Sequence, residues 1–180
     1  MAQNPVGSTS TAEPQGFLAT PTGAARRGVL VLHAWWGLNQ TIKDYCTRLS
    51  QAGFTVFAPD LYHGKVVSTI PEAEAMVKVL ETNGAHVEAD VAAAASYLAG
   101  RSAAGKGDLA VVGFSFGAYY ALELSNKEPE HIGAVVVYYG TGAEDFSASK
   151  ASYLGHFAEN DPFEPRAGVD ALEEMLKKAG

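Results

Sequence analysis

The stretch Leu109-Ala-Val-Val-Gly-Phe-Ser-Phe-Gly117 decides the fold of this 180-residue chain. Residues 109–113 form a short apolar run, which is typical of a strand covered on both faces, and residues 115–126 are expected to form a helix. Between them, Gly113-Phe-Ser-Phe-Gly117 matches G-x-S-x-G, the sharp strand-to-helix turn that exposes a nucleophilic serine. The sequence therefore predicts that Ser115 is a nucleophile at a helix N-terminus. The alternative is a tight turn in which the serine only caps the helix.

Outward from this turn, apolar runs alternate with helix-like segments. We expect strands at 28–33, 55–58, 109–113, 134–139 and 153–157, and helices at 42–52, 71–81, 86–99, 115–126 and 169–178. Such alternation implies right-handed crossovers and a mainly parallel sheet. The sequence therefore predicts one α/β domain over residues 16–180, preceded by a small, polar, flexible tail at residues 1–15.

The composition excludes several classes of protein. With 47% apolar and 18% charged residues the chain can build a core, and it has no apolar run as long as the roughly 18–20 residues of a membrane span. A net charge of −7 argues against a nucleic-acid partner. The single cysteine, Cys46, excludes an internal disulfide and is expected to be a buried apolar residue. Residues 1–16 resemble no secretory signal, so we expect a cytoplasmic protein that acts without a membrane.

A second candidate element of the site is the loop His33-Ala-Trp-Trp-Gly37, which follows the strand at 28–33. An oxyanion hole needs an N–H from such a loop, so the backbone N–H of Trp35 is expected to act together with that of Phe116. His33 and Trp36 are candidate substrate-binding residues. For His33 we favour a role in orienting the loop over a role as a base, and both indoles can equally pack in the core.

The acid of a catalytic triad is expected in the loop after a later strand. Asp161 follows the strand at 153–157 and precedes a proline, so it is the candidate, with turn or helix capping as the alternative. No HExxH motif and no cluster of histidines with carboxylates is present in the sequence, so no metal is expected.

At these residues the chain resembles the dienelactone hydrolase family of α/β-hydrolases. The PDLY box and the WWGLN loop are far more specific than G-x-S-x-G alone. The matching stretches are GFLATP (16–21), VLVLHAWWGLN (29–39), AGFTVFAPDLYHGK (52–65), VVGFSFGA (111–118), VVVYYG (135–140) and GHFAENDPFEP (155–165).

The resemblance implies a three-layer sandwich with helices on both faces of the sheet. It also implies a cofactor-free hydrolase of carboxylic esters or lactones of small, often acidic substrates. It assigns the nucleophile to Ser115, the acid to Asp161 and the oxyanion amides to Trp35 and Phe116. His63 and Lys65 lie near the family's site for a substrate carboxylate, with exposed loop residues as the alternative.

Two departures from the family pattern point to an ordinary serine-esterase mechanism. Ser115 stands where better-known members have cysteine, and Ala34 stands where many have a glutamate that interacts with that cysteine. An alcohol nucleophile has no thiolate to manage, so that glutamate is dispensable.

A third departure concerns the base. The family's histidine follows the acid, whereas all five histidines of this chain precede Asp161. We therefore expect a fold without the final strand, the histidine loop and the last helix. The alternative function is a catalytically impaired scaffold that acts as a binding or interaction module.

That expectation extends to the oligomeric state. Without a final strand, the strand at 153–157 would be an open sheet edge, a template for pairing with another chain. We therefore expect that the chain either forms a homodimer through this edge or is unstable. In a dimer, the partner's His156 or His131 is a candidate to approach Ser115.

Overall fold

The computed structural model describes residues 13–82, 84–102, 109–143 and 145–180. Most of the expected flexible tail, residues 1–12, lies outside the described residues. Glu13 and Gln15, which the sequence assigned to that tail, contact the domain. Glu13 forms an ion pair with Arg101, and the carbonyl of Gln15 accepts a hydrogen bond from the Asp60 N–H at 2.9 Å. Both residues therefore contact the domain directly before β1, which begins at Gly16.

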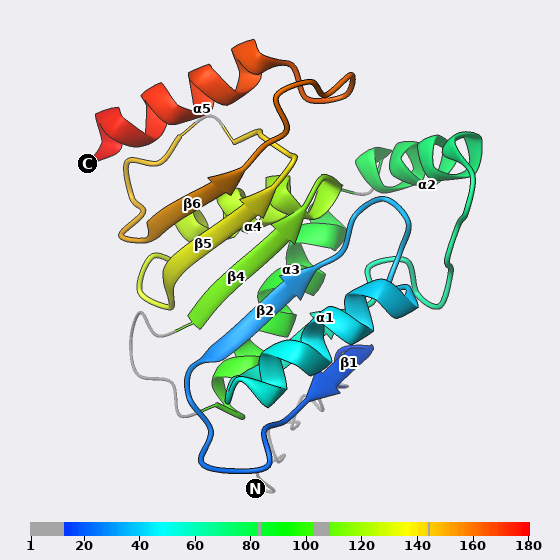
Figure 1. Ribbon diagram of the computed structural model, residues 1–180, viewed down its shortest axis with the longest axis vertical. Helices are drawn as coiled ribbons and strands as arrows, with labels where there is room; N and C mark the ends of the chain where they lie inside the picture. The colour runs from blue at the N-terminus through cyan, green and yellow to red at the C-terminus, as the bar shows by residue number, and fades with distance from the viewer. Residues whose placement is uncertain (1–12, 83, 103–108, 144) are drawn as a thin grey trace, which may run out of the picture.

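Within the described residues, six strands form one sheet in the order β1-β3-β2-β4-β5-β6. All neighbours are parallel except β1 and β3, which pair antiparallel. The strands are β1 (Gly16–Ala19), β2 (Gly28–Leu32), β3 (Thr55–Pro59), β4 (Leu109–Phe114), β5 (Ile132–Tyr138) and β6 (Ser152–His156) (Figure 1). The sequence did not predict β1, because four residues without alternation carry no strand signal of their own.

Helices cover both faces of this sheet, which confirms the three-layer α/β architecture. One face carries α1 (Gln40–Gln51), and α3 (Gly84–Ala99) and α4 (Phe116–Lys127) lie behind the sheet in Figure 1. Two more helices, α2 (Ile70–Thr82) and α5 (Arg166–Ala179), follow loops at the carboxyl ends of strands. In the described ranges no helix combines the length and apolar character needed to cross a bilayer.

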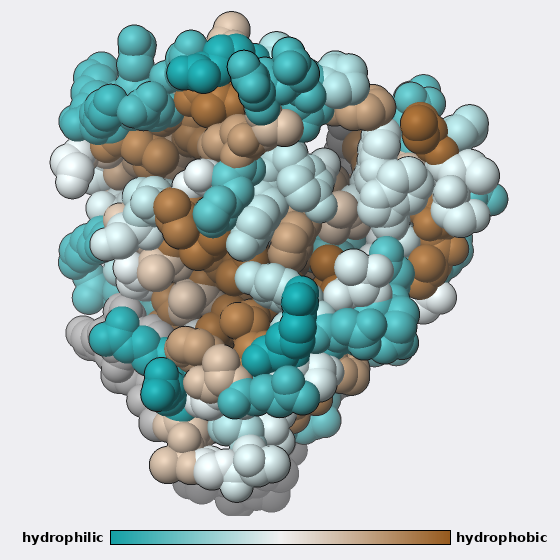
Figure 2. All heavy atoms as spheres, in the orientation of Figure 1, coloured by the Kyte–Doolittle hydropathy of each residue, from teal (hydrophilic) through white to brown (hydrophobic). Residues whose placement is uncertain are grey.

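Burial differs strongly along the sheet. Every residue of β2 and β3 is buried, because parallel strands in the middle of such a sheet are covered on both faces. At the end of the strand order farthest from β1, four of the five residues of β6 are exposed. Apolar side chains reach the surface on the sheet face between α1 and α5 (Figure 2).

Candidate active site

Ser115 occupies the turn between β4 and α4 in a strained conformation. Its φ is 48° and its ψ is −115°, a region that residues with a Cβ rarely adopt. Its N–H donates to the carbonyl of Tyr138 at 2.9 Å, and its side chain makes no helix-capping hydrogen bond. The strained geometry expected of a nucleophile elbow is therefore present, and a merely capping serine is not what the structure shows.

The two glycines of the motif are required by close backbone contacts. A Cβ on Gly113 would lie 2.5 Å from the Cα of Ala118, and a Cβ on Gly117 would lie 2.4 Å from the carbonyl oxygen of Leu32. Real Cβ atoms do not approach other atoms this closely. The first turn of α4 thus packs directly on the end of β2, and this contact places the elbow beside the loop that follows β2.

The two expected oxyanion amides come from these adjoining segments. Leu32 and Gly113 are register partners on the parallel strands β2 and β4, so the loops after both strands begin side by side. In the described part of the chain, the N–H groups of Trp35 and Phe116 donate to no protein acceptor. The Phe116 N–H also lies at the positive end of the α4 dipole. Both amides are therefore available to a developing negative charge.

His33 holds the loop after β2 in place. The imidazole is 0% exposed; Nδ1 donates to the carbonyl of Ala34 at 2.7 Å, and Nε2 accepts from the N–H of Leu61 at 3.3 Å. Burial lowers the pKa of His33 below its ordinary value. The geometry supports the loop-orienting role, and a contact of His33 with substrate, which its full burial does not favour, stays a prediction.

Aromatic contacts bring the acid loop to the same end of the sheet as Ser115. The Trp35 ring packs edge-on against Phe163, and their centroids are 5.5 Å apart. Phe163 lies two residues beyond Asp161 in the loop after β6. The loop that carries Asp161 therefore contacts the loop after β2, which carries Trp35. The Trp36 ring also packs edge-on against the Trp35 ring, with centroids 5.5 Å apart. The carbonyl of Trp36 accepts a hydrogen bond from the Val67 N–H.

Asp161 has a local structural role in addition to any chemical one. Its Oδ1 accepts hydrogen bonds from the N–H groups of Phe163 at 2.8 Å and Glu164 at 3.2 Å. The turn-capping alternative is therefore realised. Among the described residues no donor reaches its other oxygen, Oδ2, so one carboxylate oxygen stays available for a catalytic partner.

The five histidines, all in the described ranges, make no hydrogen bond to Ser115 or Asp161. His63 lies 3.6 Å from the Asp90 carboxylate, and Nδ1 of His131 donates to the Glu128 carboxylate at 2.9 Å. His156 stacks on Tyr138, with ring centroids 4.6 Å apart. His86 lines a cavity with His63. The arrangement thus supplies a serine, two amides and a carboxylate, but no imidazole in contact with them.

His63 and Lys65 lie together on a separate cavity of about 500 Å³ between the loop after β3 and helices α2 and α3. Ser115 does not line this cavity. It borders the oxyanion loop, however, because a Cβ on Gly37 would lie 2.4 Å from the Lys65 carbonyl oxygen. The exposed-loop alternative describes both side chains, and a contact with substrate is left as a prediction.

Two further residues at this end escaped the sequence analysis. The Glu164 carboxylate accepts from the Thr141 N–H at 2.9 Å and from its hydroxyl at 2.8 Å, which ties together the loops after β5 and β6. Phe163 is 68% exposed beside Trp35 and can contact a substrate. Both lie inside the matched stretch GHFAENDPFEP, which was the available signal.

Cys46 is fully buried in α1, and burial raises its pKa to about 12. Across the described residues, no three histidine, cysteine, aspartate or glutamate side chains gather in a way that could hold a metal ion.

Comparisons with known proteins agree with this geometry. A model of the dienelactone hydrolase family matches residues 15–180. "Protein usf" of Aquifex pyrophilus is 34% identical over 130 residues, and the match covers 70% of this chain and 56% of that protein. A protein of Aquifex aeolicus named "Putative carboxymethylenebutenolidase" is 31% identical with the same coverage. The chain therefore spans about half the length of these curated relatives.

Among solved structures, the one titled "m3DLH" superimposes with a TM-score of 0.79 at 23% identity. That match covers 91% of this chain and 71% of the other chain. At this level of identity the likeness is one of fold.

Proposed function

The chain belongs to the dienelactone hydrolase family, and from this we propose that it hydrolyses carboxylic esters or lactones of small substrates through an acyl-enzyme on Ser115. The observation that carries the proposal is the strained conformation of Ser115, which follows β4 where the loop after β2 begins alongside it. Such a backbone conformation costs of order 1–3 kcal/mol, and residues held in this way cluster at active sites.

In the proposed mechanism, Oγ of Ser115 attacks the carbonyl carbon of the ester or lactone. The N–H groups of Trp35 and Phe116 donate to the oxygen that becomes negative, and each such donor contributes typically 10²–10³-fold in rate. Collapse of the tetrahedral intermediate expels the alcohol, or opens the lactone ring, and leaves an acyl ester on Ser115. Water then attacks the acyl ester and releases the acid. A general base, which the described residues do not bring to Ser115, takes the Oγ proton in the first step, returns it to the departing alcohol, and takes a proton from the water in the second. Asp161 is proposed to orient this base and stabilise its protonated form.

A second candidate function is a binding module on an impaired hydrolase scaffold. The observation that favours it is the lack of an imidazole on Ser115 or Asp161 in the described ranges. A serine hydroxyl is a weak nucleophile unless a base removes its proton. The scaffold would then bind a small carbonyl compound at the two amides without turning it over.

Labelling with a fluorophosphonate separates the two candidates, because covalent capture requires an activated serine. The hydrolase proposal expects labelling of the wild-type chain and hydrolysis of p-nitrophenyl acetate. Both signals should be lost in Ser115→Ala and kept in Ser68→Ala, which removes an exposed serine of the loop before α2. A folded wild-type chain without label or turnover would reject the hydrolase and support the scaffold.

A further inference from the structure

A groove of about 450 Å³ lies between α2, the start of α3 and the first turn of α4. This size is typical of sites for small organic ligands. We call it the Phe116 groove, after the residue whose main chain carries one of the two expected oxyanion amides. In the described part of the chain it is lined by Val77, Gly84, Glu88, Phe116, Tyr119 and Tyr120.

The Phe116 groove and the nucleophile share the first turn of α4. Phe116 directly follows Ser115 in the chain and contributes its side chain to the lining. Tyr119 lies four residues after Ser115, so the two residues are one helical turn apart on the same side of α4. An ester whose carbonyl oxygen accepts from the Phe116 N–H therefore has a substituent within reach of the groove.

The walls of the Phe116 groove are mainly aromatic. The rings of Phe116 and Tyr120 pack edge-on with centroids 5.0 Å apart, and those of Tyr119 and Tyr120 do so at 5.1 Å. Tyr119 also packs against the loop after β5, because a Cβ on Gly142 would lie 2.4 Å from its ring. It nevertheless keeps 40% of its surface exposed. Aromatic rings that are held in this way favour another ring in an edge-on or offset arrangement.

The charge of the lining disfavours an anionic group. Among the described residues that line the Phe116 groove, the charged side chain is the carboxylate of Glu88. Lys127, which pairs with it at 2.9 Å, lines a different cavity, between α3 and α4. A carboxylate on the substrate would be repelled by Glu88, whereas an uncharged ring would not. This preference differs from the acidic substrates that the family resemblance implies.

A buried hydroxyl beside the groove lacks a hydrogen-bond partner. Tyr62 is 2% exposed and its ring packs against that of Phe116, with centroids 6.2 Å apart. Among the described residues, no group pairs with its hydroxyl. Burial and the neighbouring Tyr120 phenol raise the pKa of Tyr62 to about 12, so the hydroxyl keeps its proton and can donate. A buried donor of this kind favours a ligand that brings an acceptor oxygen.

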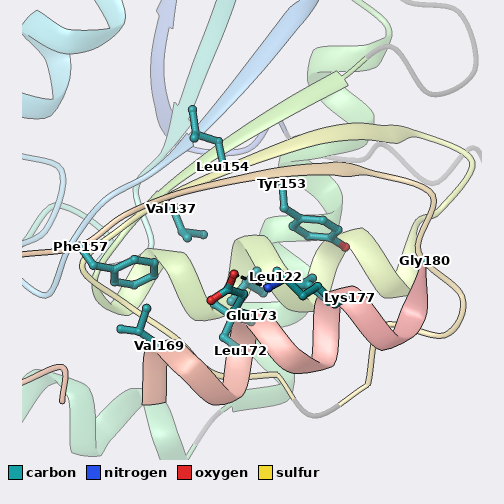
Figure 3. Close-up of a pocket in the computed structure, with 12 residues that line it drawn as sticks. Leu122, Val137, Tyr153, Leu154, Phe157, Val169, Leu172, Glu173, Lys177 and Gly180 are labelled. Atoms are coloured by element: carbon teal, nitrogen blue, oxygen red, sulfur yellow. Dashed lines mark ion pairs between the residues drawn. The ribbon is translucent and has the colours of Figure 1, made fainter. Parts of the chain in front are cut away.

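A second groove, of about 510 Å³, lies between β6 and α5, and Phe157 and Leu172 are among the residues that line it (Figure 3). Neither Trp35 nor Phe116 lines this second groove. It is therefore not continuous with the expected oxyanion amides, and the Phe116 groove is the better candidate for a part of the substrate.

We propose that the Phe116 groove binds an uncharged aromatic group of the ester, so that the substrates are aryl esters of small acids. The place of this group in a reaction rests on the proposed hydrolysis at Ser115. Binding of the aromatic ring itself requires no turnover, and it can be measured on the chain whether or not an ester is hydrolysed.

Calorimetric titration with β-naphthol and β-naphthoate tests the binding. The two compounds share one ring system and differ in charge, so β-naphthol should bind at least tenfold more tightly. Gly84→Leu should weaken β-naphthol at least tenfold, because a Cβ on this lining residue has nothing within 4 Å and the longer side chain fills the groove. The matched control is Gly23→Leu, which also has open space around its Cβ but precedes β2, and it should leave the dissociation constant unchanged.

The absence of β-naphthol binding to the wild-type chain, equal binding of β-naphthoate, or equal effects of the two variants would overturn the proposal. Circular dichroism of Gly84→Leu shows whether the variant is folded. Tyr119→Ala, which shortens an exposed wall of the groove, is the second variant and should also weaken β-naphthol.

Hydrolysis of β-naphthyl acetate separates this proposal from the proposed function. Gly84→Leu should raise KM for this ester at least tenfold, and Gly23→Leu should not change it. Binding of β-naphthol without any turnover of the ester would refute the hydrolase and support the groove. Turnover with a KM that Gly84→Leu leaves unchanged would support the hydrolase and refute the groove.

Discussion

The contact between Gly117 and the end of β2 gives the sharpest test of how the elbow is built. In Gly117→Ala, the new Cβ would lie 2.4 Å from the carbonyl oxygen of Leu32 and 2.7 Å from that of His33. Ordinary van der Waals contact begins at 3.4 Å, so the first turn of α4 has to move about 1.0 Å away from β2 (3.4 minus 2.4). Both opposing atoms are main chain, so no side-chain rotation relieves the clash.

The cost of this movement follows from what surrounds it. Overpacking in a well-packed interior typically costs about 1–3 kcal/mol, and a rigid backbone neighbour favours the upper part of that range. For a chain of this size, each kcal/mol corresponds to about 2–4 °C in melting temperature. We therefore expect Gly117→Ala to melt about 4–12 °C lower than the wild type. Since the same movement separates the Phe116 and Trp35 amides, it should also lower any esterase rate more than tenfold.

Urea denaturation followed by circular dichroism measures the change in the free energy of unfolding. Gly84→Ala is the matched control: Gly84 also lies in the first turn of a helix, and a Cβ there has nothing within 4 Å. In that variant the stability should stay the same or rise by up to about 1 kcal/mol, because alanine favours a helix over glycine. Equal stabilities of Gly117→Ala and the wild type would refute the close packing of α4 on β2.

Two further predictions concern buried titratable groups. Burial lowers the pKa of His33, so its imidazole takes up a proton more readily in the unfolded chain than in the folded one. The stability that the neutral, buried imidazole contributes is therefore complete above about pH 6.5. It is lost as the pH falls toward the lower pKa of the folded state, by at most about 1.4 kcal/mol per pH unit. His33→Gln keeps a hydrogen-bond donor and an acceptor but does not titrate. Between pH 7.5 and pH 5, its free energy of unfolding in urea should therefore fall less than that of the wild type. An equal fall would contradict the assignment of this pH dependence to His33. Burial raises the pKa of Cys46 to about 12, so Ellman's reagent should react with the chain only after unfolding, and immediate reaction of the native chain would show that α1 is not packed as described.

Local sequence determined those parts of the fold whose energetics are local. The short, mostly apolar runs of β2, β3 and β4 predict buried parallel strands, because such runs are typical of strands that are covered on both faces. The sequence also predicts the turn at Ser115, because the five residues from Gly113 to Gly117 contain both glycines that its close backbone contacts require. Helix α1 was found because its apolar residues recur at helical spacing.

Contacts between distant segments decided the rest. The strand β1 exists through its pairing with β3, where Gly16 lies opposite Pro59 and a Cβ on Gly16 would meet the Ala58 carbonyl at 2.4 Å. His33 owes its buried, loop-holding role to an N–H that lies 28 residues further along the chain. Composition and spacing cannot encode such a partner, because a hydrogen bond across the fold depends on where the backbone of both segments has already been placed by packing.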